Sequence, residues 1–329
     1  MKIEKITFFN YQDSTYRIYQ NYYINSLSSI CKRLKIKFKV VPEKTNKDFN
    51  AHVGEYEVVF SGRKKLRFAI DAHDHRDIRS EPILNKSDLY FKSNKWGNVP
   101  YPDKVIPVIN GNGLINEKQK GQLISLRGQE PIYDLIFISR VWGGREHNIR
   151  IFEQIAKIPC KKKVLALFTE SDKTQEATPA FMNRLEKAQI EFTYNDVDTG
   201  RLWEETARSR WVLVRAGKHL CIPWRMIDLL TLNSAVIIDS DPYPKWPTPL
   251  QEGINFYSLG INRPFDTDPA IQQEYDLIPD KMQSILGDTN LAEQISHNNK
   301  MYFEDHVDFP KVGQYIVEEL EKKAAALWN

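Results

Sequence analysis

Residues 134–148 read DLIFISRVWGGREHN. A short apolar run bounded by polar residues predicts a buried strand, two adjacent glycines predict a loop, and the residues from Glu146 onward predict a helix. In such a unit, the loop N–H groups and the helix N-terminus attract an anion. The stretch therefore predicts a phosphate site, with a tight turn carrying two solvated arginines as the alternative. The candidate residues are Ser139, Arg140, Gly143, Gly144 and Arg145.

The same alternation of short apolar strands and helical stretches runs through most of the chain. The predicted strands are 3–9, 37–41, 57–60, 66–71, 89–92, 105–109, 134–139, 163–168, 191–194, 211–214 and 235–239. The predicted helices are 14–34, 146–157, 179–188, 200–209, 223–232 and 312–328. This alternation is typical of α/β proteins with mostly parallel sheets.

A polar stretch over 116–130 separates two runs of the alternation. We therefore expect an α/β protein with two Rossmann-like lobes and a C-terminal helical segment. Ligands of such sheets bind beyond the carboxyl ends of the strands, so we expect a cleft between the lobes where these ends face each other. The expected domains are 1–125, 126–310 and a C-terminal helix over 311–329 that packs back on the first lobe.

The composition excludes several classes of protein. With 41% hydrophobic residues the chain can build a core, and 46 basic against 43 acidic residues leave a net charge of only +3. That balance disfavours broad nucleic-acid binding, although a local basic run (Lys32, Arg33, Lys35, Lys37 and Lys39) keeps the possibility open. No apolar run is long enough to span a membrane, which leaves only peripheral membrane contact. Three separated cysteines and the absence of a signal-like start favour a cytoplasmic protein.

A second candidate binding stretch covers residues 215–228, RAGKHLCIPWRMID. It follows a predicted strand and enters a helix, so its basic, glycine-bearing loop suits a pyrophosphate. Asp228 follows Arg225 by three residues, so the two side chains share one face of the predicted helix, and the carboxylate suits a ribose diol. The alternative is an ordinary ion pair between Arg225 and Asp228 on the protein surface. The candidate residues here are Arg215, Gly217, Lys218, Arg225 and Asp228.

The third stretch, RFAIDAHDHRD over 67–77, places acids and imidazoles at the end of a strand. Asp71, His73 and Asp74 are candidate general bases. His and Asp are also metal ligands, but an HDH sequence in a polar loop is more often solvated or hydrogen-bonded, so no metal is expected.

Residues 239–250 hold four prolines and form a stiff loop in which Tyr243 or Trp246 could stack on a base or a sugar. The alternative is a rigid loop that packs the end of the sheet. The motifs GxGxxG, GxxxxGK[ST], HExxH and GxSxG are absent, which weakens dehydrogenase, NTPase, zinc-protease and serine-hydrolase interpretations. The acidic pair in 196–198 follows a predicted edge strand and is a poor metal motif.

Together these stretches resemble the GT-B glycosyltransferases, which have two lobes and use nucleotide sugars. Residues 225–239, RMIDLLTLNSAVIID, are similar to the donor signature of that group, although Asp228 stands where many members have Glu. Residues 142–148 and 90–92 look like bacterial enzymes that build surface polysaccharides. The order of motifs also resembles phage DNA β-glucosyltransferases, whose general base is an acid in the position of Asp71. The likeness covers about half of the chain and is weak in the first lobe.

The resemblance implies transfer of a hexose-type sugar from a nucleoside-diphosphate sugar to a saccharide or glycoconjugate acceptor, without a cofactor or metal. It implies phosphate roles for Arg140, Arg145 and Arg225 and a ribose role for Asp228. Inversion would use Asp71 as the base, with His73 or Asp74 as substitutes, whereas retention needs none. Two alternatives stay open: a DNA-base glucosyltransferase, and a non-catalytic two-lobed protein that binds nucleotides or sugars.

Overall fold

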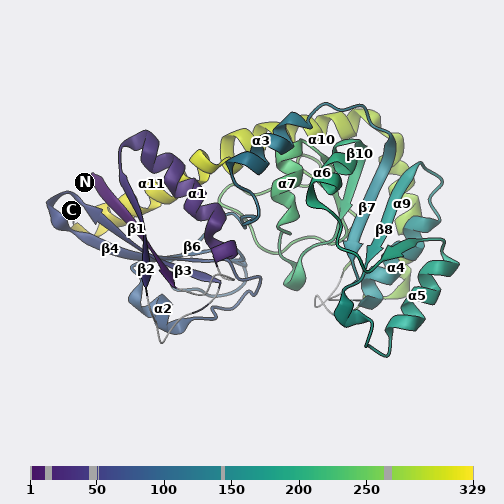
Figure 1. The fold of residues 1–329 in the computed structure, drawn as a ribbon, viewed down its shortest axis with the longest axis horizontal. Helices are drawn as coiled ribbons and strands as arrows, with labels where there is room; N and C mark the ends of the chain where they lie inside the picture. The colour runs from purple at the N-terminus through teal and green to yellow at the C-terminus, as the bar shows by residue number, and fades with distance from the viewer. Residues whose placement is uncertain are drawn as a thin grey trace. The chain divides into compact units, whose positions relative to one another are not determined.

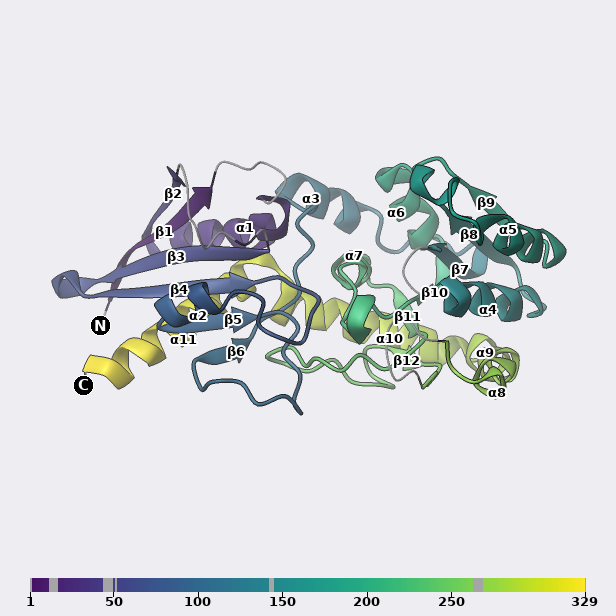
Figure 2. The ribbon, with the colours of Figure 1, turned by 90° about the horizontal axis from the view of Figure 1, so that it is seen from below.

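The computed structural model describes residues 2–11, 17–43, 50, 52–141, 145–262 and 269–328. The chain divides into two compact units (Figures 1 and 2). Unit 1 contains Met1–Gln122, Tyr243–Pro249 and Tyr302–Asn329, and unit 2 contains Leu123–Pro242 and Leu250–Met301. The predicted second lobe, 126–310, is thus interrupted by a short return to unit 1 and ends earlier. Local sequence patterns carry no signal for such a return.

Unit 1 contains a six-stranded sheet in the order β2-β1-β3-β4-β5-β6. Its strands are β1 (Ile3–Tyr11), β2 (Lys37–Glu43), β3 (Val53–Phe60), β4 (Lys65–Asp71), β5 (Leu89–Lys92) and β6 (Val105–Pro107). All neighbours are parallel except β3, which is antiparallel to both β1 and β4. The cause is local: only Ser61–Lys64 separate β3 from β4, with Gly62 at φ 78°, and so short a link cannot cross over a sheet.

Helices cover both faces of this sheet. They are α1 (Arg17–Leu34), α2 (Glu81–Lys86) and α11 (Phe309–Trp328). On one face α1 packs along α11, and a Cβ at Gly313 would lie 2.2 Å from the Ser26 carbonyl oxygen, so only glycine permits this approach. On the other face α2 packs Ile83 and Leu84 against Ala69 and Tyr90.

Unit 2 has a six-stranded sheet that is parallel throughout, in the order β12-β11-β10-β7-β8-β9. Its strands are β7 (Tyr133–Arg140), β8 (Lys162–Leu167), β9 (Glu191–Thr193), β10 (Ser209–Val214), β11 (Ala235–Ile238) and β12 (Tyr257–Ser258). The predicted α/β class with two Rossmann-like lobes is confirmed. β9 forms an edge of the sheet, as the sequence predicts.

The helices of unit 2 lie on both faces of its sheet. They are α4 (Arg145–Ala156), α5 (Thr178–Lys187), α6 (Thr199–Ala207), α7 (Arg225–Leu232), α8 (Gln272–Asp276), α9 (Ile278–Gly287) and α10 (Thr289–Tyr302), while α3 (Glu117–Ser125) spans the boundary between the units. Figure 1 shows α6 and α7 on one side of the sheet and α4, α5 and α9 on the other. One large apolar cluster of unit 2 includes Phe137, Phe152 and Trp211.

Candidate functional site

The strand order of unit 2 has a switch point between β7 and β10. From β7 the chain proceeds outward to β8 and β9, and it then returns to β10 on the other side of β7 before continuing to β11 and β12. In open α/β sheets, ligands bind at such a point, beyond the carboxyl ends of the two strands. The parallel pairing of β7 with β10 thus places the strand end that carries Ser139 and Arg140 beside the strand end that precedes Arg215.

A buried carboxylate, Asp239, organises the loops at this switch point. Its Oδ1 accepts hydrogen bonds from Ala216 N at 2.5 Å and Ser240 N at 2.8 Å, and its Oδ2 lies 2.6 Å from His147 Nε2. His147 Nδ1 lies 2.7 Å from the Tyr275 hydroxyl. One side chain therefore fixes both the loop after β10 and the first turn of α4.

In the sequence, Asp239 ends both a predicted strand and the donor-like signature and begins the proline-rich loop, but no role of its own was predicted for it. It ends an apolar strand, which is the signal that singled out Asp71, so the same reasoning could have found it. Its partner His147 stands inside the helix start that the sequence predicted, but spacing alone does not reveal the contact.

Asn148 holds the backbone at the end of β7. Its Nδ2 donates to the Val141 carbonyl at 2.9 Å and the Arg140 carbonyl at 3.3 Å. The Arg140 guanidinium is exposed and lies 3.5 Å from Asp196. Such an exposed ion pair contributes little to the stability of the protein, so the Arg140 guanidinium can leave Asp196 and bind an anionic ligand instead. Gly143 and Gly144 lie outside the described residues, as does the side chain of Arg145.

The loop after β10 has a tight shape that requires glycine. Gly217 N donates to the Cys221 carbonyl at 2.8 Å, and a Cβ at Gly217 would lie 2.4 Å from the sulfur of Cys221. The Gly217–Cys221 hydrogen bond and the Ala216–Asp239 hydrogen bond hold this loop beyond the carboxyl end of β10. Arg215 starts this loop and is partly buried. The side chain of Lys218 lies outside the described residues.

Arg225 and Asp228 lie deeper in unit 2 than an exposed i,i+3 pair. Arg225 donates to the Ile138 carbonyl and to the Thr206 hydroxyl, both at 3.0 Å. Burial lowers the pKa of Arg225, while Asp228 opposes the shift. Asp228 accepts from Trp203 Nε1 at 3.0 Å. These contacts join α7 to β7 and α6, so both residues have a packing role; their ligand roles stay predictions.

In unit 1, Asp71 is enclosed rather than open to solvent. The fully buried carboxylate lies 3.1 Å from Lys92 Nζ and accepts from the Tyr90 hydroxyl at 3.0 Å and from His73 N at 2.9 Å. Lys92 is fully buried as well. Because three donors hold the Asp71 carboxylate, it fixes the end of β4. The contact with Lys92 could not be predicted from the sequence, because Lys92 lies at the end of another strand, β5.

The neighbouring histidines are closer to solvent. His73 stacks on His52 with ring centroids 4.1 Å apart, and His73 Nε2 lies 2.9 Å from Asn50 Oδ1. Burial lowers the pKa of His73 to about 4, against the opposing effect of Asp71. His73 is therefore a neutral imidazole near pH 7, which is the form that accepts a proton. Asp74 is partly buried, and its backbone carbonyl accepts from the Asn94 amide.

His52 and Asn50 were not predicted as site residues. They precede β3, about twenty residues before His73, and their approach depends on the antiparallel pairing of β3 with β4. A sequence pattern that assumes parallel strands does not place them there.

The part of the proline-rich loop that holds both predicted aromatic residues, Tyr243–Pro249, belongs to unit 1, and the two side chains have different surroundings. Trp246 is buried, with its ring stacked near Tyr302 at 6.3 Å. Tyr243 is exposed and stacks on Trp96 at 4.4 Å. Trp246 therefore packs the loop, and only Tyr243 keeps surface for a ligand.

Three further observations concern partners. Among the residues that the structure describes, no group of three or more His, Cys, Asp or Glu side chains is arranged to hold a metal ion. Within the same residues, no helix is both long and apolar enough to cross a membrane. The five basic residues of the run from Lys32 to Lys39 are all exposed, at the end of α1 and along the edge strand β2.

No protein-family model matches the chain, and no curated protein matches it. Solved structures do. A glycosyltransferase from Rickettsia africae is 11% identical, covers 100% of this chain and 99% of its own, and gives a TM-score of 0.48. The Anabaena protein Alr3699/HepE, solved with UDP and glucose, is 12% identical, with 72% and 64% covered and a TM-score of 0.49. The C-terminal domain of a glycosyl transferase group 1 family protein, LpcC, from Francisella tularensis is 19% identical, with 57% and 91% covered and a TM-score of 0.38.

Two of these structures are named as glycosyltransferases, which is the class of enzyme that the sequence resembles. The chain spans less than two thirds of the length of HepE. At such identities the likeness concerns the fold alone, and a fold by itself does not assign a reaction.

Proposed function

We propose that this chain is a glycosyltransferase that moves a hexose-type sugar from a nucleoside-diphosphate sugar to an acceptor hydroxyl. The observation that carries the proposal is the switch point of unit 2. The end of β7 carries Arg140 and the end of β10 precedes Arg215, and Asp239 orders the loop after β10 together with the first turn of α4. That arrangement suits an anionic, nucleotide-like ligand.

The donor diphosphate is proposed to bind beyond the ends of β7 and β10. Arg140 and Arg215 supply positive charge, and the N-terminus of α4 adds its dipole. When the bond between the anomeric carbon and the phosphate oxygen breaks, the nucleoside diphosphate gains negative charge. Groups already oriented toward that charge lower the barrier more than mobile water does. This role needs no metal ion.

The acceptor hydroxyl must lose its proton as its oxygen bonds to the anomeric carbon. In an inverting reaction, His73 is a candidate base because its imidazole follows the end of β4 and is partly open to solvent. Asp74 is a second candidate. Asp71 is held by Lys92 and Tyr90 and suits a positioning role better. A retaining reaction would use none of the three as base.

The biological setting is proposed from sequence likeness to be bacterial polysaccharide or glycoconjugate synthesis. One observation favours a second function, glucosylation of DNA bases: the run Lys32–Lys39 is basic and exposed along α1 and β2. DNA binding depends on such phosphate contacts and weakens strongly with salt.

Isothermal titration calorimetry with UDP, GDP and ADP, against free glucose and galactose, tests the proposal. We expect one nucleoside diphosphate to bind and the matching nucleotide sugar to be hydrolysed slowly without an acceptor. Binding of free sugars alone, with no nucleotide bound or hydrolysed, would support a non-catalytic sugar-binding protein instead. Salt-sensitive binding of duplex DNA, with a nucleotide sugar consumed only when DNA is present, would support the DNA-modifying alternative.

A further inference from the structure

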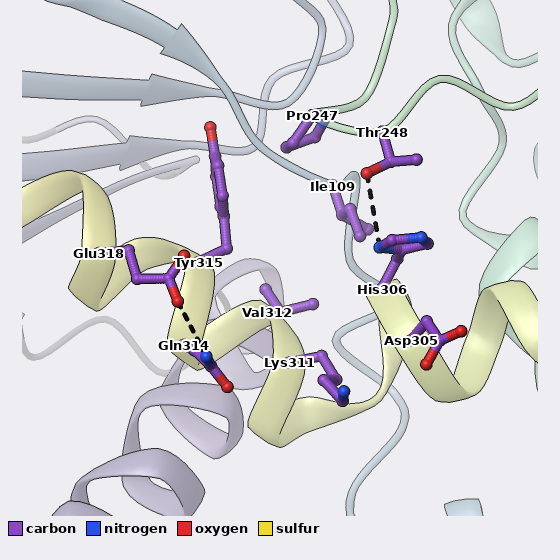
Figure 3. Close-up of a pocket in the computed structure, with 10 residues that line it drawn as sticks. All are labelled: Ile109, Pro247, Thr248, Asp305, His306, Lys311, Val312, Gln314, Tyr315 and Glu318. Carbon is purple, nitrogen blue, oxygen red and sulfur yellow. Dashed lines mark hydrogen bonds between the residues drawn. The ribbon is translucent and has the colours of Figure 1, made fainter.

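A pocket lies within unit 1, and its lining contains none of the candidate site residues described above (Figure 3). Its apolar walls are Ile109, Pro247 and Val312. The ring of Tyr315 forms another wall and is held in place, because the Tyr315 hydroxyl donates to the Pro107 carbonyl at 2.8 Å. Polar side chains complete the lining: Thr248, Asp305, His306, Lys311, Gln314 and Glu318.

The backbone at this pocket has an unusual form. Residues Phe303–Val307 make a π-helix between α10 and α11, and two of them, Asp305 and His306, line the pocket. π-Helical turns are rare and occur often at functional sites. The turn is supported from outside the pocket, because the Tyr22 hydroxyl donates to the Val307 carbonyl.

Two charged side chains of the lining, Asp305 and Lys311, are available to bind a ligand. Within the described part of the chain, neither the Asp305 carboxylate nor the Lys311 ammonium has a hydrogen-bond or ion-pair partner. Other lining groups are paired with one another: Gln314 donates to Glu318 at 2.8 Å, and His306 Nδ1 lies 3.4 Å from the Thr248 hydroxyl. The pocket therefore offers a free acceptor and a free donor beside an aromatic wall.

This chemistry selects one class of ligand. The charges of Asp305 and Lys311 oppose each other and Glu318 adds a negative charge, so the pocket has no excess of positive charge to hold a phosphate. The polar lining is equally unsuited to a purely apolar chain. A neutral sugar fits, since each hydroxyl both donates and accepts, and the C–H face of a pyranose ring can pack against an aromatic ring.

We propose that this pocket is a saccharide-binding site of unit 1, separate from the proposed nucleotide site of unit 2. Asp305 and Lys311 would hydrogen-bond to the sugar hydroxyls, and Tyr315 would contact the ring. The inference does not require the proposed transferase activity, because it rests on the lining of this pocket alone.

Saturation-transfer NMR with maltose, lactose and N,N′-diacetylchitobiose tests the site in the full chain, with titrations to obtain a Kd. The double variant Asp305→Ala/Lys311→Ala removes the free acceptor and donor, both of which are exposed. A matched control, Glu321→Ala/Lys322→Ala, removes the same charges from α11 outside the pocket lining. We expect at least one disaccharide to bind, the first variant to lose about tenfold or more in affinity, and the control to bind like the unmodified protein.

The proposal is wrong if none of the three sugars gives saturable binding, or if both double variants bind the sugar equally well. Displacement of the sugar by millimolar inorganic phosphate would also overturn it, because an anion site would then be present. Nucleoside diphosphate affinity, measured in the same samples, should stay unchanged in both variants, so that failure here is distinct from failure of the proposed transferase function.

Discussion

His147 Nε2 lies 2.6 Å from Asp239 Oδ2, and both side chains are buried inside unit 2. The other oxygen of Asp239 accepts the Ala216 N–H. Asp239 thus couples the first turn of α4 to the loop that follows β10. The two segments proposed to hold a diphosphate are positioned by one carboxylate.

Asp239→Asn tests this coupling. The change keeps the shape but replaces one acceptor oxygen by an amide, so it weakens a buried, charge-assisted bond. We expect the free energy of unfolding to fall by about 1–3 kcal/mol and the affinity for the best nucleoside diphosphate to fall about tenfold. Chemical denaturation and calorimetry measure the two effects. The control Asp241→Asn changes an exposed carboxylate two residues later and should leave both values unchanged.

Arg140 and Asp196 form an exposed ion pair, and we expect substitutions of the two residues to have different effects on nucleotide affinity. Arg140→Ala should reduce nucleotide affinity by about 1.5–3 kcal/mol, because a charge-assisted bond to phosphate is lost, while stability changes little. Asp196→Asn breaks the same pair but leaves the guanidinium available, so it should preserve or slightly improve the affinity. Calorimetry on both variants decides; equal losses would show that the pair, rather than the arginine, matters.

Asp71 and Lys92 form a buried ion pair, and removing one partner leaves the other charge unpaired. Asp71→Asn is therefore expected to reduce the free energy of unfolding by about 3–5 kcal/mol. The double variant Asp71→Asn/Lys92→Met removes both charges and should recover a large part of that loss. Urea denaturation of the two single variants and the double variant gives the coupling energy. Additive losses would mean that the two groups do not interact.

Activity should survive excess EDTA. The diphosphate is proposed to be neutralised by Arg140, Arg215 and the start of α4, which would take the place of a cation. Nucleotide-sugar hydrolysis, followed with and without EDTA, measures this directly. A complete loss that Mg²⁺ or Mn²⁺ restores would contradict the expectation.

The ends of the strands were the part of the candidate site whose position in the fold could be predicted from the sequence. Apolar runs ended by polar residues located Asp71, Arg140 and Arg215, because the carboxyl ends of parallel strands share one edge of a sheet. The same runs predicted both sheets. The antiparallel β3 and the return of Tyr243–Pro249 to unit 1 depend on contacts between distant segments, which no local pattern contains.

The helix pair Arg225 and Asp228 illustrates a second limit. Their i,i+3 spacing correctly puts them on one face of α7, but spacing does not say which way that face points. In the structure it points to Ile138, Thr206 and Trp203. The orientation follows from the tertiary packing of α7 against β7 and α6.

In the proposed inverting mechanism, His73 is the candidate base. Asn50 Oδ1 lies 2.9 Å from His73 Nε2 and also accepts the His52 N–H, which identifies it as the amide oxygen. It therefore favours the tautomer with the proton on Nε2 and leaves Nδ1 to accept a proton. With its pKa lowered to about 4, His73 stays unprotonated through the neutral range.

His73→Gln keeps a side chain of similar polarity but removes the proton acceptor. We expect kcat to fall by about 10²–10⁴-fold with nucleotide affinity near that of the unmodified protein. Stability gives an independent readout. The pKa of His73 is lower in the folded chain than its ordinary value of 6.5, so the unfolded chain binds more protons between these values, and stability falls as the pH drops from 6.5 toward 4. The Gln variant should lose that part of the acid sensitivity.

The two readouts separate a base from a merely structural residue. A smaller acid sensitivity with an unchanged kcat would mean that His73 is buried as described but does not take the proton. In that case Asp74→Asn tests the neighbouring carboxylate. If kcat survives that change too, the anomeric configuration of the product, read by NMR, distinguishes the remaining explanations: retention removes the need for a base, whereas inversion requires one elsewhere in the chain.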